Sequence, residues 1–382
     1  MTKGHVRKRG AKWVYVTELP RVDGRRKQRW SRGFDTRREA QRALTETLSA
    51  LGAGTYVAPS RVNVTDFLVN QWLPAIRATV RSSTWASYRE EIINHIVPNI
   101  GAIPLQSLTP SALNAMYGLL QASGRLDHKG GLSARTVRYQ HTIVRRALHD
   151  AVRWGLVTRN VADLADPPRP PRPTMKCWDP AQIGQFLDHV VGHRLEALFV
   201  LALTSGMRRG ELLGLRWSDV DFEGRRLSIR QTVIAVGYKI EVSEPKTDAS
   251  RRSIVLDGAT LADLGKHRAR QSAERLAQDS LYVQNDLVFA ALDGSPLHPQ
   301  NVSAAFRRLC KSASLPVIRF HDLRHSYATA ALSTDVHQKV VSERLGHSSI
   351  AITMDTYSHV MPSVAEEGAL RIAAVIHGAR TA

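Results

Sequence analysis

The spacing of apolar residues along the chain predicts a helical section between residues 64 and 163. Apolar side chains recur there every three or four positions, which is the period of a helix with one buried face. We expect four helices on this basis, over 64–72, 82–96, 109–122 and 133–154, with a Gly-rich break at 124–131. Polar and basic residues occupy the opposite face of two of these helices, at Thr84, Tyr88, Arg89, Arg135, Arg138, His141, Arg145 and Arg146.

The first 60 residues follow a different pattern, with apolar and polar residues alternating as they do in strands. Strands are expected over 12–18 and 27–34, joined by a turn at Asp23 and Gly24. Thr36 and Glu39 have the spacing of a capping box, which predicts that a helix begins there and runs to about Leu51. The pattern therefore predicts a small sheet backed by one helix.

Residues 175–382 are expected to form a mainly helical domain with one small antiparallel sheet. An apolar helix over 195–203 ends at Ser205 and Gly206, and strands are expected over 227–233, 238–242 and 252–256. Lys246 lies in the turn between the last two strands, so it is expected at the tip of a hairpin. Residues 166–174 contain five prolines, which exclude a helix or a central strand and predict an extended linker of roughly 28 Å.

The charge of the chain points to a polyanionic partner. The chain holds 53 Lys and Arg against 34 Asp and Glu, which gives a net charge of +19. Residues 1–60 hold 14 basic residues against 5 acidic ones, an excess of nine. Secreted proteins can also have a basic pI, so the pI alone is weak evidence. The basic helix faces carry the same sign of charge as the whole chain, which favours contact with nucleic acid over a merely solvated surface.

The cysteines and the apolar runs narrow the class of protein further. Cys177 and Cys310 are too few and too far apart for a disulfide framework or a Cys-based zinc site, and we expect buried thiols in a reducing cytosol. The basic N-terminus has no apolar core after it, so a signal peptide is not expected. No apolar run is long enough to predict a membrane span.

A tyrosine close to several cationic residues is the pattern that carries chemistry. Tyr357 offers a phenol nucleophile, and the arginines and histidines before it could neutralise charge on a phosphoryl group. Arg208 is expected in the first turn of a helix, beside free backbone N–H groups that would favour an anion, with Glu211 holding it from the same face. Without the preceding Thr204-Ser205-Gly206 segment, Arg208 and Glu211 would be interpreted as a surface ion-pair cluster.

A zinc hydrolase is a weaker alternative for the same residues. His321 and His325 have the i, i+4 spacing of a metal-binding histidine pair. However, Asp322 stands where such a motif has glutamate, and no third ligand is recognisable.

Four segments, in this order along the chain, resemble the signature motifs of the tyrosine recombinases, the phage integrase family. They are Thr204–Leu212, His321-x-x-Arg324, Leu345-Gly346-His347 and Tyr357-Ser358-His359. The resemblance implies a multidomain protein: a small α+β arm-type DNA-binding domain at 1–60, an all-α core-binding domain at 61–165, a proline-rich linker at 166–174 and a mainly α catalytic domain with a small antiparallel sheet at 175–382.

The resemblance also implies a role for each catalytic residue. Tyr357 would attack a phosphodiester, and Arg208 and Arg324 would bind its two non-bridging oxygens. His321 would hydrogen-bond the phosphate and help to take the tyrosine proton, while His347 would donate to the phosphate. Lys246 would protonate the leaving 5′ oxygen. The remaining side chains nearby, His325, His359 and Met361, are expected to pack rather than react.

The function implied is site-specific recombination of double-stranded DNA through a 3′-phosphotyrosine, in a phage or another mobile element. The ester keeps the energy of the broken bond, so no ATP, metal or other cofactor is expected. The resemblance implies attachment sites of core and arm type and a homotetramer on DNA in the cytoplasm of a bacterial host. A DNA-bending host factor and an excision factor are compatible partners. The alternative is a catalytically inactive DNA-binding regulator of the same fold.

Overall fold

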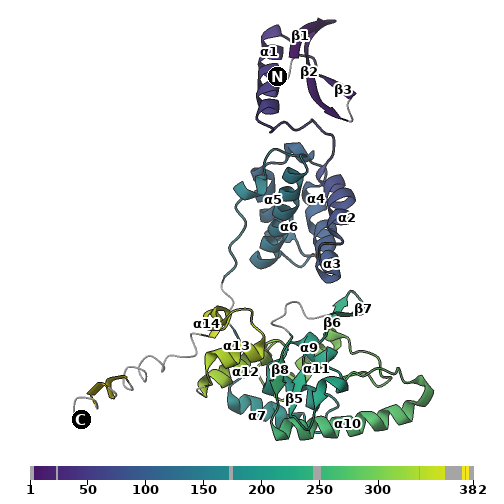
Figure 1. Cartoon of the computed structure of the whole chain (residues 1–382), viewed down its shortest axis with the longest axis vertical. Coiled ribbons are helices and arrows are strands. Elements are labelled where there is room, and N and C mark those ends of the chain that lie inside the picture. Colours follow the sequence, from purple (N-terminus) through teal and green to yellow (C-terminus); the bar gives the residue numbers. More distant parts are fainter. Residues whose placement is uncertain are drawn as a thin grey trace. The chain divides into compact units, whose positions relative to one another are not determined.

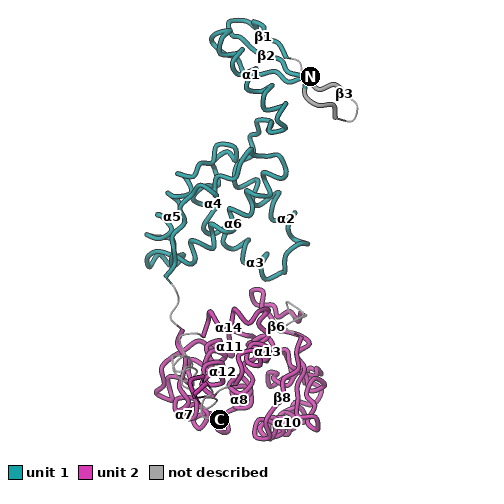
Figure 2. Tube along the Cα trace, turned by 60° about the vertical axis from the view of Figure 1, so that its left-hand side comes forward, with its two compact units in different colours: residues 1–172 teal, residues 173–382 magenta. Residues whose placement is uncertain are grey.

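The computed structural model describes residues 4–22, 25–171, 175–243, 251–334, 336–357, 372–374 and 376–377. The chain divides into two compact units, residues 1–172 and residues 173–382 (Figure 2). Each unit has its own buried cluster of apolar side chains.

The chain begins with a three-stranded antiparallel sheet backed by one helix (Figure 1). Its elements are β1 (Gly4–Arg9), β2 (Lys12–Val22), β3 (Arg25–Trp30) and α1 (Arg37–Gly52). The capping box is confirmed, because the Thr36 hydroxyl accepts from the Glu39 amide and the Glu39 carboxylate accepts from the Thr36 amide. Strand β1 was not predicted, because its basic residues hide the alternation, and the turn predicted at 23–24 lies outside the described residues.

The rest of the first unit is helical, as predicted. The helical elements are the π-helical segment Asp66–Trp72, α2 (Leu73–Ile76), α3 (Ser82–Glu91), the π-helical segment Ile92–Ile96, α4 (Val97–Ile100), the 3₁₀ turn Leu105–Ser107, α5 (Pro110–Ser123), α6 (Ala134–Arg153) and the 3₁₀ turn Val161–Leu164. The third expected helix is confirmed at α5 and the fourth at α6, each to within one or two residues of the predicted bounds.

Two of these helices continue through a proline. A proline lacks the amide hydrogen and its ring clashes with the carbonyl group four residues earlier, so Pro74 and Pro98 would normally end a helix. In both cases a π-helical segment ends two residues before the proline, at Trp72 and at Ile96. The wider π turn relieves the clash. The second helix therefore reaches Ile100, beyond its predicted end.

Two members of the predicted basic face instead point inward. Tyr88 is 8% exposed and stacks on Trp72 in the apolar core. His141 is also 8% exposed, and its Nδ1 forms a 2.8 Å hydrogen bond with the Tyr117 hydroxyl. The prediction was wrong for these two residues because their polar atoms find partners inside the protein, which removes the cost of burying them.

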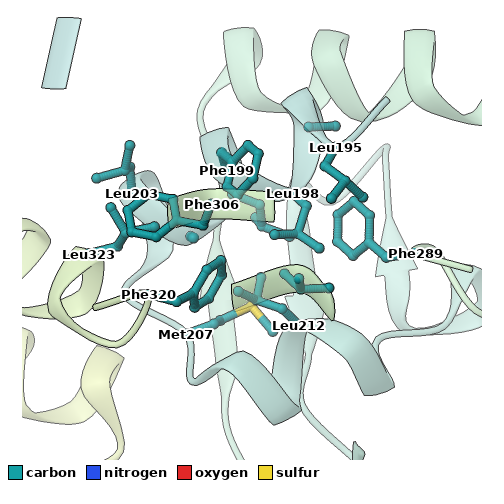
Figure 3. Packing of buried hydrophobic residues seen from close by; sticks show 14 of the residues in the cluster. Leu195, Leu198, Phe199, Leu203, Met207, Leu212, Phe289, Phe306, Phe320 and Leu323 are labelled. Atoms are coloured by element: carbon teal, nitrogen blue, oxygen red, sulfur yellow. The ribbon is translucent and has the colours of Figure 1, made fainter. Parts of the chain in front are cut away.

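The second unit is mainly helical. Its elements are α7 (Pro180–His189), α8 (Glu196–Ser205), α9 (Arg209–Gly214), the 3₁₀ turn Trp217–Asp219, β4 (Val220–Asp221), β5 (Arg226–Ser228), β6 (Thr232–Val236), β7 (Lys239–Ser243), β8 (Ser253–Val255), α10 (Gly258–Gln278), the 3₁₀ turn Asp279–Leu281, α11 (Pro299–Ser312), α12 (Asp322–Ser333), α13 (Gln338–Leu345) and α14 (Ile350–Tyr357). Phe199, Phe306 and Phe320 meet at its centre (Figure 3). Each such side chain contributes roughly 1.5–3 kcal/mol by leaving water, so this core holds the surrounding helices in place.

The strands of the second unit form two small sheets rather than one. One sheet has the order β4-β5-β8 and the other pairs β6 with β7. Gly237, with φ of +62°, and Tyr238 form a two-residue turn that closes β6 on β7. The hairpin predicted around Lys246 is therefore wrong: β7 and β8 belong to different sheets, and Lys246 itself lies outside the described residues.

Candidate active site

Two glycines in left-handed conformation anchor the two arginines of the site. Gly206 (φ +65°) ends α8 and Gly346 (φ +66°) ends α13. The Gly206 carbonyl accepts a 2.8 Å hydrogen bond from Nη1 of Arg324, and the Gly346 carbonyl accepts one of 2.8 Å from Nη2 of Arg208. A Cβ at position 206 would lie 2.4 Å from the Tyr327 ring, so both the backbone angle and the space require glycine.

A buried carboxylate links Arg208 to a further arginine. Glu211, 4% exposed, accepts 2.7 Å and 2.9 Å hydrogen bonds from the side chain and the backbone amide of Arg208. It also accepts bonds of 3.2 Å and 3.0 Å from Arg252. Glu211 holds Arg208 as predicted, and because it also accepts from the Arg208 amide, that amide is not one of the free N–H groups expected at the start of this helix. Burial acts to raise the pKa of Glu211, yet Arg252 and Arg208 hold it below its usual value.

The Tyr357 hydroxyl lies within hydrogen-bonding distance of a histidine. Tyr357 is 1% exposed and packs with Ala328, Leu332, Val341 and Leu345, which come from α12 and α13. Helices α12, α13 and α14 lie together in the second unit (Figure 1). The Tyr357 hydroxyl is 2.7 Å from Nδ1 of His325. The expectation that His325 only packs was therefore wrong.

Both histidines predicted to bind phosphate lie at the ends of helices. His347 follows the left-handed Gly346, as predicted, and its Nδ1 is 2.8 Å from the Thr353 hydroxyl of α14. His321 is the residue just before α12, and its ring lies edge-on to the His325 ring at 5.3 Å. Thr353 was not predicted, although its spacing from His347 and Tyr357 in the sequence would have allowed it.

Together with the short stretches of chain between neighbouring residues, these hydrogen bonds form a closed circuit. Arg208 binds the end of α13, and His347, next in the chain, binds α14. Tyr357, at the end of α14, binds His325 of α12, and Arg324 binds the end of α8, two residues before Arg208. Four of the six predicted catalytic residues, Arg208, Arg324, His347 and Tyr357, thus lie in one connected group, and His321 adjoins it through its ring contact with His325. The sixth, Lys246, is outside the described residues.

The site favours neutral histidines and a bound anion. Burial and nearby arginines lower the pKa of His347 to about 4. His321 is exposed as a residue, yet the partial burial of its imidazole, with His325 and Arg324 beside it, also lowers its pKa to about 4. Burial, with repulsion from Arg208 and Arg252, lowers the pKa of Arg324 to about 9, so its guanidinium stays charged at pH 7. An anion between these cations would relieve the repulsion.

The described residues contain no group of three or more side chains of metal-binding type. In the same part of the chain, the helices are too short or too polar to cross a membrane.

Comparison with known protein families assigns the chain to one of them. A model of the phage integrase family matches residues 178–363. A model of an arm DNA-binding domain matches residues 5–51, and one of the phage integrase N-terminal SAM-like domain matches residues 66–117. The chain belongs to the phage integrase family of tyrosine recombinases. It is therefore an enzyme of DNA strand cleavage and rejoining, and its function is site-specific recombination.

Relatives of this recombinase match it over most of their length. An integrase of Streptomyces ambofaciens is 29% identical over 354 residues, covering 88% of this chain and 86% of the relative. A XerC-like tyrosine recombinase of Caldanaerobacter subterraneus is 28% identical over 347 residues, covering 86% and 87%.

Solved structures share the fold. The Tn1549 transposon integrase in complex with a circular intermediate DNA is 21% identical, with a TM-score of 0.67 over 81% of this chain and 99% of that one. A lambda integrase tetramer bound to a Holliday junction is 19% identical, with a TM-score of 0.56 over 90% of this chain and 95% of that one. The multidomain architecture predicted from the sequence is thereby confirmed.

Proposed function

We propose that Tyr357 is the nucleophile of this recombinase and attacks a DNA phosphodiester to form a 3′-phosphotyrosine. The closed circuit of hydrogen bonds is the observation that carries the proposal, because it ties the tyrosine to both arginines through α12, α13 and α14. A covalent ester of this kind needs an oxygen nucleophile and fixed cations around the phosphoryl oxygens.

In this proposal Arg208 and Arg324 bind the two non-bridging oxygens of the attacked phosphate. Each guanidinium uses one nitrogen to bind a glycine carbonyl, which fixes its plane before DNA arrives. Fixed donors do not have to reorganise as charge moves during the reaction, and this is the main source of electrostatic catalysis. His321 and His347 would donate to the same phosphate, and a phosphate beside them would raise their pKa.

Lys246 is proposed as the acid that protonates the leaving 5′ oxygen. An alkoxide leaves slowly unless it receives a proton, and lysine can supply one whereas arginine keeps its own. The proposal is supported by Arg252, which follows soon after Lys246 in the sequence and is bonded to Glu211.

A basic groove in the first unit is proposed to bind double-stranded DNA at the core of the attachment site. The groove has a volume of about 1020 Å³, and its lining includes Arg138, Arg145, Arg146, His149 and Arg169 together with Asp163 and Asp166. Arg169 belongs to the proline-rich segment, so the positive surface continues into the proposed linker. Such residues bind the phosphate backbone and would hold DNA without reading its sequence.

The sheet at the start of the chain is proposed to bind a second, arm-type DNA site. The guanidinium of Arg7 lies 4.0 Å from the centre of the Trp30 ring and that of Arg9 lies 5.4 Å from it. Trp30 is 39% exposed, so this cation–π pair presents ordered arginines at the surface. A basic strand face of this kind suits a DNA groove.

The assembly and the domain limits are also proposals. We propose the domain limits 1–60, 61–165, 166–174 and 175–382, and a homotetramer on DNA, supported by the tetramer of lambda integrase on a Holliday junction. The bacterial and phage relatives support a role in a phage or mobile element acting in a bacterial cytoplasm. A DNA-bending host factor and an excision factor fit a recombinase that bridges two kinds of site.

The test uses a nicked DNA duplex that traps the covalent intermediate. Its sequence comes from the direct repeats that flank the element encoding the chain. Wild-type protein should form an adduct that resists denaturation, and Tyr357→Phe should bind the duplex with similar affinity but form no adduct. Adduct formation by the variant would place the nucleophile elsewhere, and no adduct with the wild-type protein would favour an inactive DNA-binding regulator.

A further inference from the structure

His325 contacts the oxygen atom that the proposed reaction uses. Its Nδ1 lies 2.7 Å from the Tyr357 hydroxyl, and the two rings lie 5.7 Å apart at an angle of 55°. Tyr357 is 1% exposed, so water has little access to this hydroxyl. A proton leaving the tyrosine therefore has His325 as its direct acceptor.

The direction of the hydrogen bond follows from the charge states. Burial raises the pKa of Tyr357, so its hydroxyl is protonated at neutral pH. Burial lowers the pKa of His325, so its ring is neutral. The hydroxyl then donates to Nδ1, and the ring proton sits on Nε2. This is the arrangement of a general base before proton transfer.

Two other histidines of the described site, His321 and His347, are not placed to take this proton. His321 contacts the ring of His325 rather than the tyrosine, and His347 is bonded to Thr353. Among the described residues, no carboxylate is hydrogen-bonded to the Tyr357 hydroxyl. The role that the family resemblance gave to His321 is therefore better filled by His325, four residues later on α12.

We propose that His325 is the general base for Tyr357, a role that rests on the proposed attack by this tyrosine. As the Tyr357 oxygen forms its bond to phosphorus, its proton passes to Nδ1 of His325, and the bond between phosphorus and the 5′ oxygen breaks. The leaving 5′ oxygen takes a proton from Lys246. The positive charge gained by His325 is lost again when the reverse step returns the proton to the tyrosine.

The surroundings of His325 suit a ring that gains charge only during the reaction. Asp322 acts to raise its pKa, while Arg324 and Arg319 act to lower it. His321 lies against the ring from the same helix, Tyr357 faces it from α14, and the Cys177 thiol lies within the electrostatic range of that tyrosine. As the tyrosine oxygen becomes part of a phosphate ester, the adjacent negative charge would stabilise the imidazolium.

The experiment measures the rate of adduct formation on the nicked duplex in a single turnover. His325→Gln keeps a side chain that can hydrogen-bond but cannot take the proton, and it should react roughly 10²–10⁴-fold more slowly. His325→Ala should be slow as well, and added imidazole should restore part of its rate. His189→Gln is the matched control, because this exposed histidine of the same unit bonds only Ser312 in the described structure.

Two further readouts separate a base from a residue that only shapes the site. The wild-type rate should fall as pH drops through the pKa of His325, and this limb should disappear in His325→Gln. Replacing the 5′ bridging oxygen of the DNA by sulfur removes the need for an acid. It should rescue Lys246→Ala but not His325→Gln, because His325 acts on the nucleophile.

The outcomes are distinct. A normal rate for His325→Gln, or a faster one, overturns the proposal, and a faster rate would mean that His325 restrains the tyrosine. Rescue of His325→Gln by the sulfur substrate also overturns it. Adduct formation by Tyr357→Phe, run in parallel, would instead refute the proposed function itself.

Discussion

Replacing Glu211 by glutamine should destabilise the second unit, because the Glu211 carboxylate binds both Arg208 and Arg252. The Glu211 and Arg252 side chains are 4% and 8% exposed, and the atoms that join them are 3.0 Å apart. Glutamine has nearly the same shape but removes this negative charge from beside the buried Arg252 guanidinium. Breaking such a pair costs about 3–5 kcal/mol, and we expect the lower end because the glutamine oxygen still accepts a hydrogen bond.

The assay is thermal denaturation of the full-length protein followed by circular dichroism. A loss of about 3 kcal/mol corresponds to a fall of roughly 6–12 °C in the Tm of a unit this size. Glu274→Gln is the matched control. Its partner Arg194 is 25% exposed, so water can solvate the guanidinium that loses its carboxylate, and the loss of stability should be smaller.

A double variant tests the cause of the loss. Adding Arg252→Met to Glu211→Gln removes the buried positive charge as well, so part of the lost stability should return. If Glu211→Gln unfolds at the same temperature as Glu274→Gln, or if the double variant is no more stable than the single one, the buried ion pair does not stabilise the second unit in this way.

Three other predictions concern stability, leaving-group chemistry and DNA binding. The pKa of His347 is about 4 in the folded protein and ~6.5 in the unfolded chain. Between these pH values the unfolded chain binds more protons than the folded protein, so the free energy of unfolding should fall as pH drops from ~6.5 towards 4. A Tm independent of pH in this window would contradict this. Lys246→Ala should cleave slowly on ordinary DNA and at nearly the wild-type rate on DNA with a 5′ bridging sulfur; without that rescue, Lys246 is not the acid. Deleting residues 1–60 should remove footprints at arm-type sites and spare the core, and it should flatten the salt dependence of arm binding. Equal loss at both sites would make this segment a general electrostatic anchor.

The parts of the fold that could be predicted from the sequence depend on local rules. The capping box at Thr36 and the helices α5 and α6 follow from hydrogen-bonding side chains and a regular apolar period. Helix α4 was missed because a proline normally ends a helix, and only the π turn before Pro98 allows it to continue. The strand pairing around Lys246 was wrong because it depends on a turn at Gly237 that was not recognised.

The residues of the candidate site also divide into those that local motifs predict and those that depend on tertiary packing. Arg208, Arg324, His347 and Tyr357 could be chosen as candidates from the sequence because their motifs are short and local, and the structure joins them in one group. Arg252 and the contact of His325 with the tyrosine depend on how distant segments pack, and the i, i+4 spacing of His321 and His325 gave no sign of that contact. Thr353 lies close to His347 in the sequence and could have been predicted from that spacing. Periodicity likewise could not tell that His141 finds a partner in the core at Tyr117.

The identity of the nucleophile is tested most directly by mass spectrometry of the trapped adduct. Wild-type protein is incubated with the nicked duplex, digested with protease and nuclease, and searched for a peptide that carries a nucleotide through a phosphate ester. We predict that the modified residue is Tyr357, joined to the 3′ phosphate. A nucleotide on any other residue, or a phosphate joined through its 5′ side, would contradict the proposed attack by Tyr357.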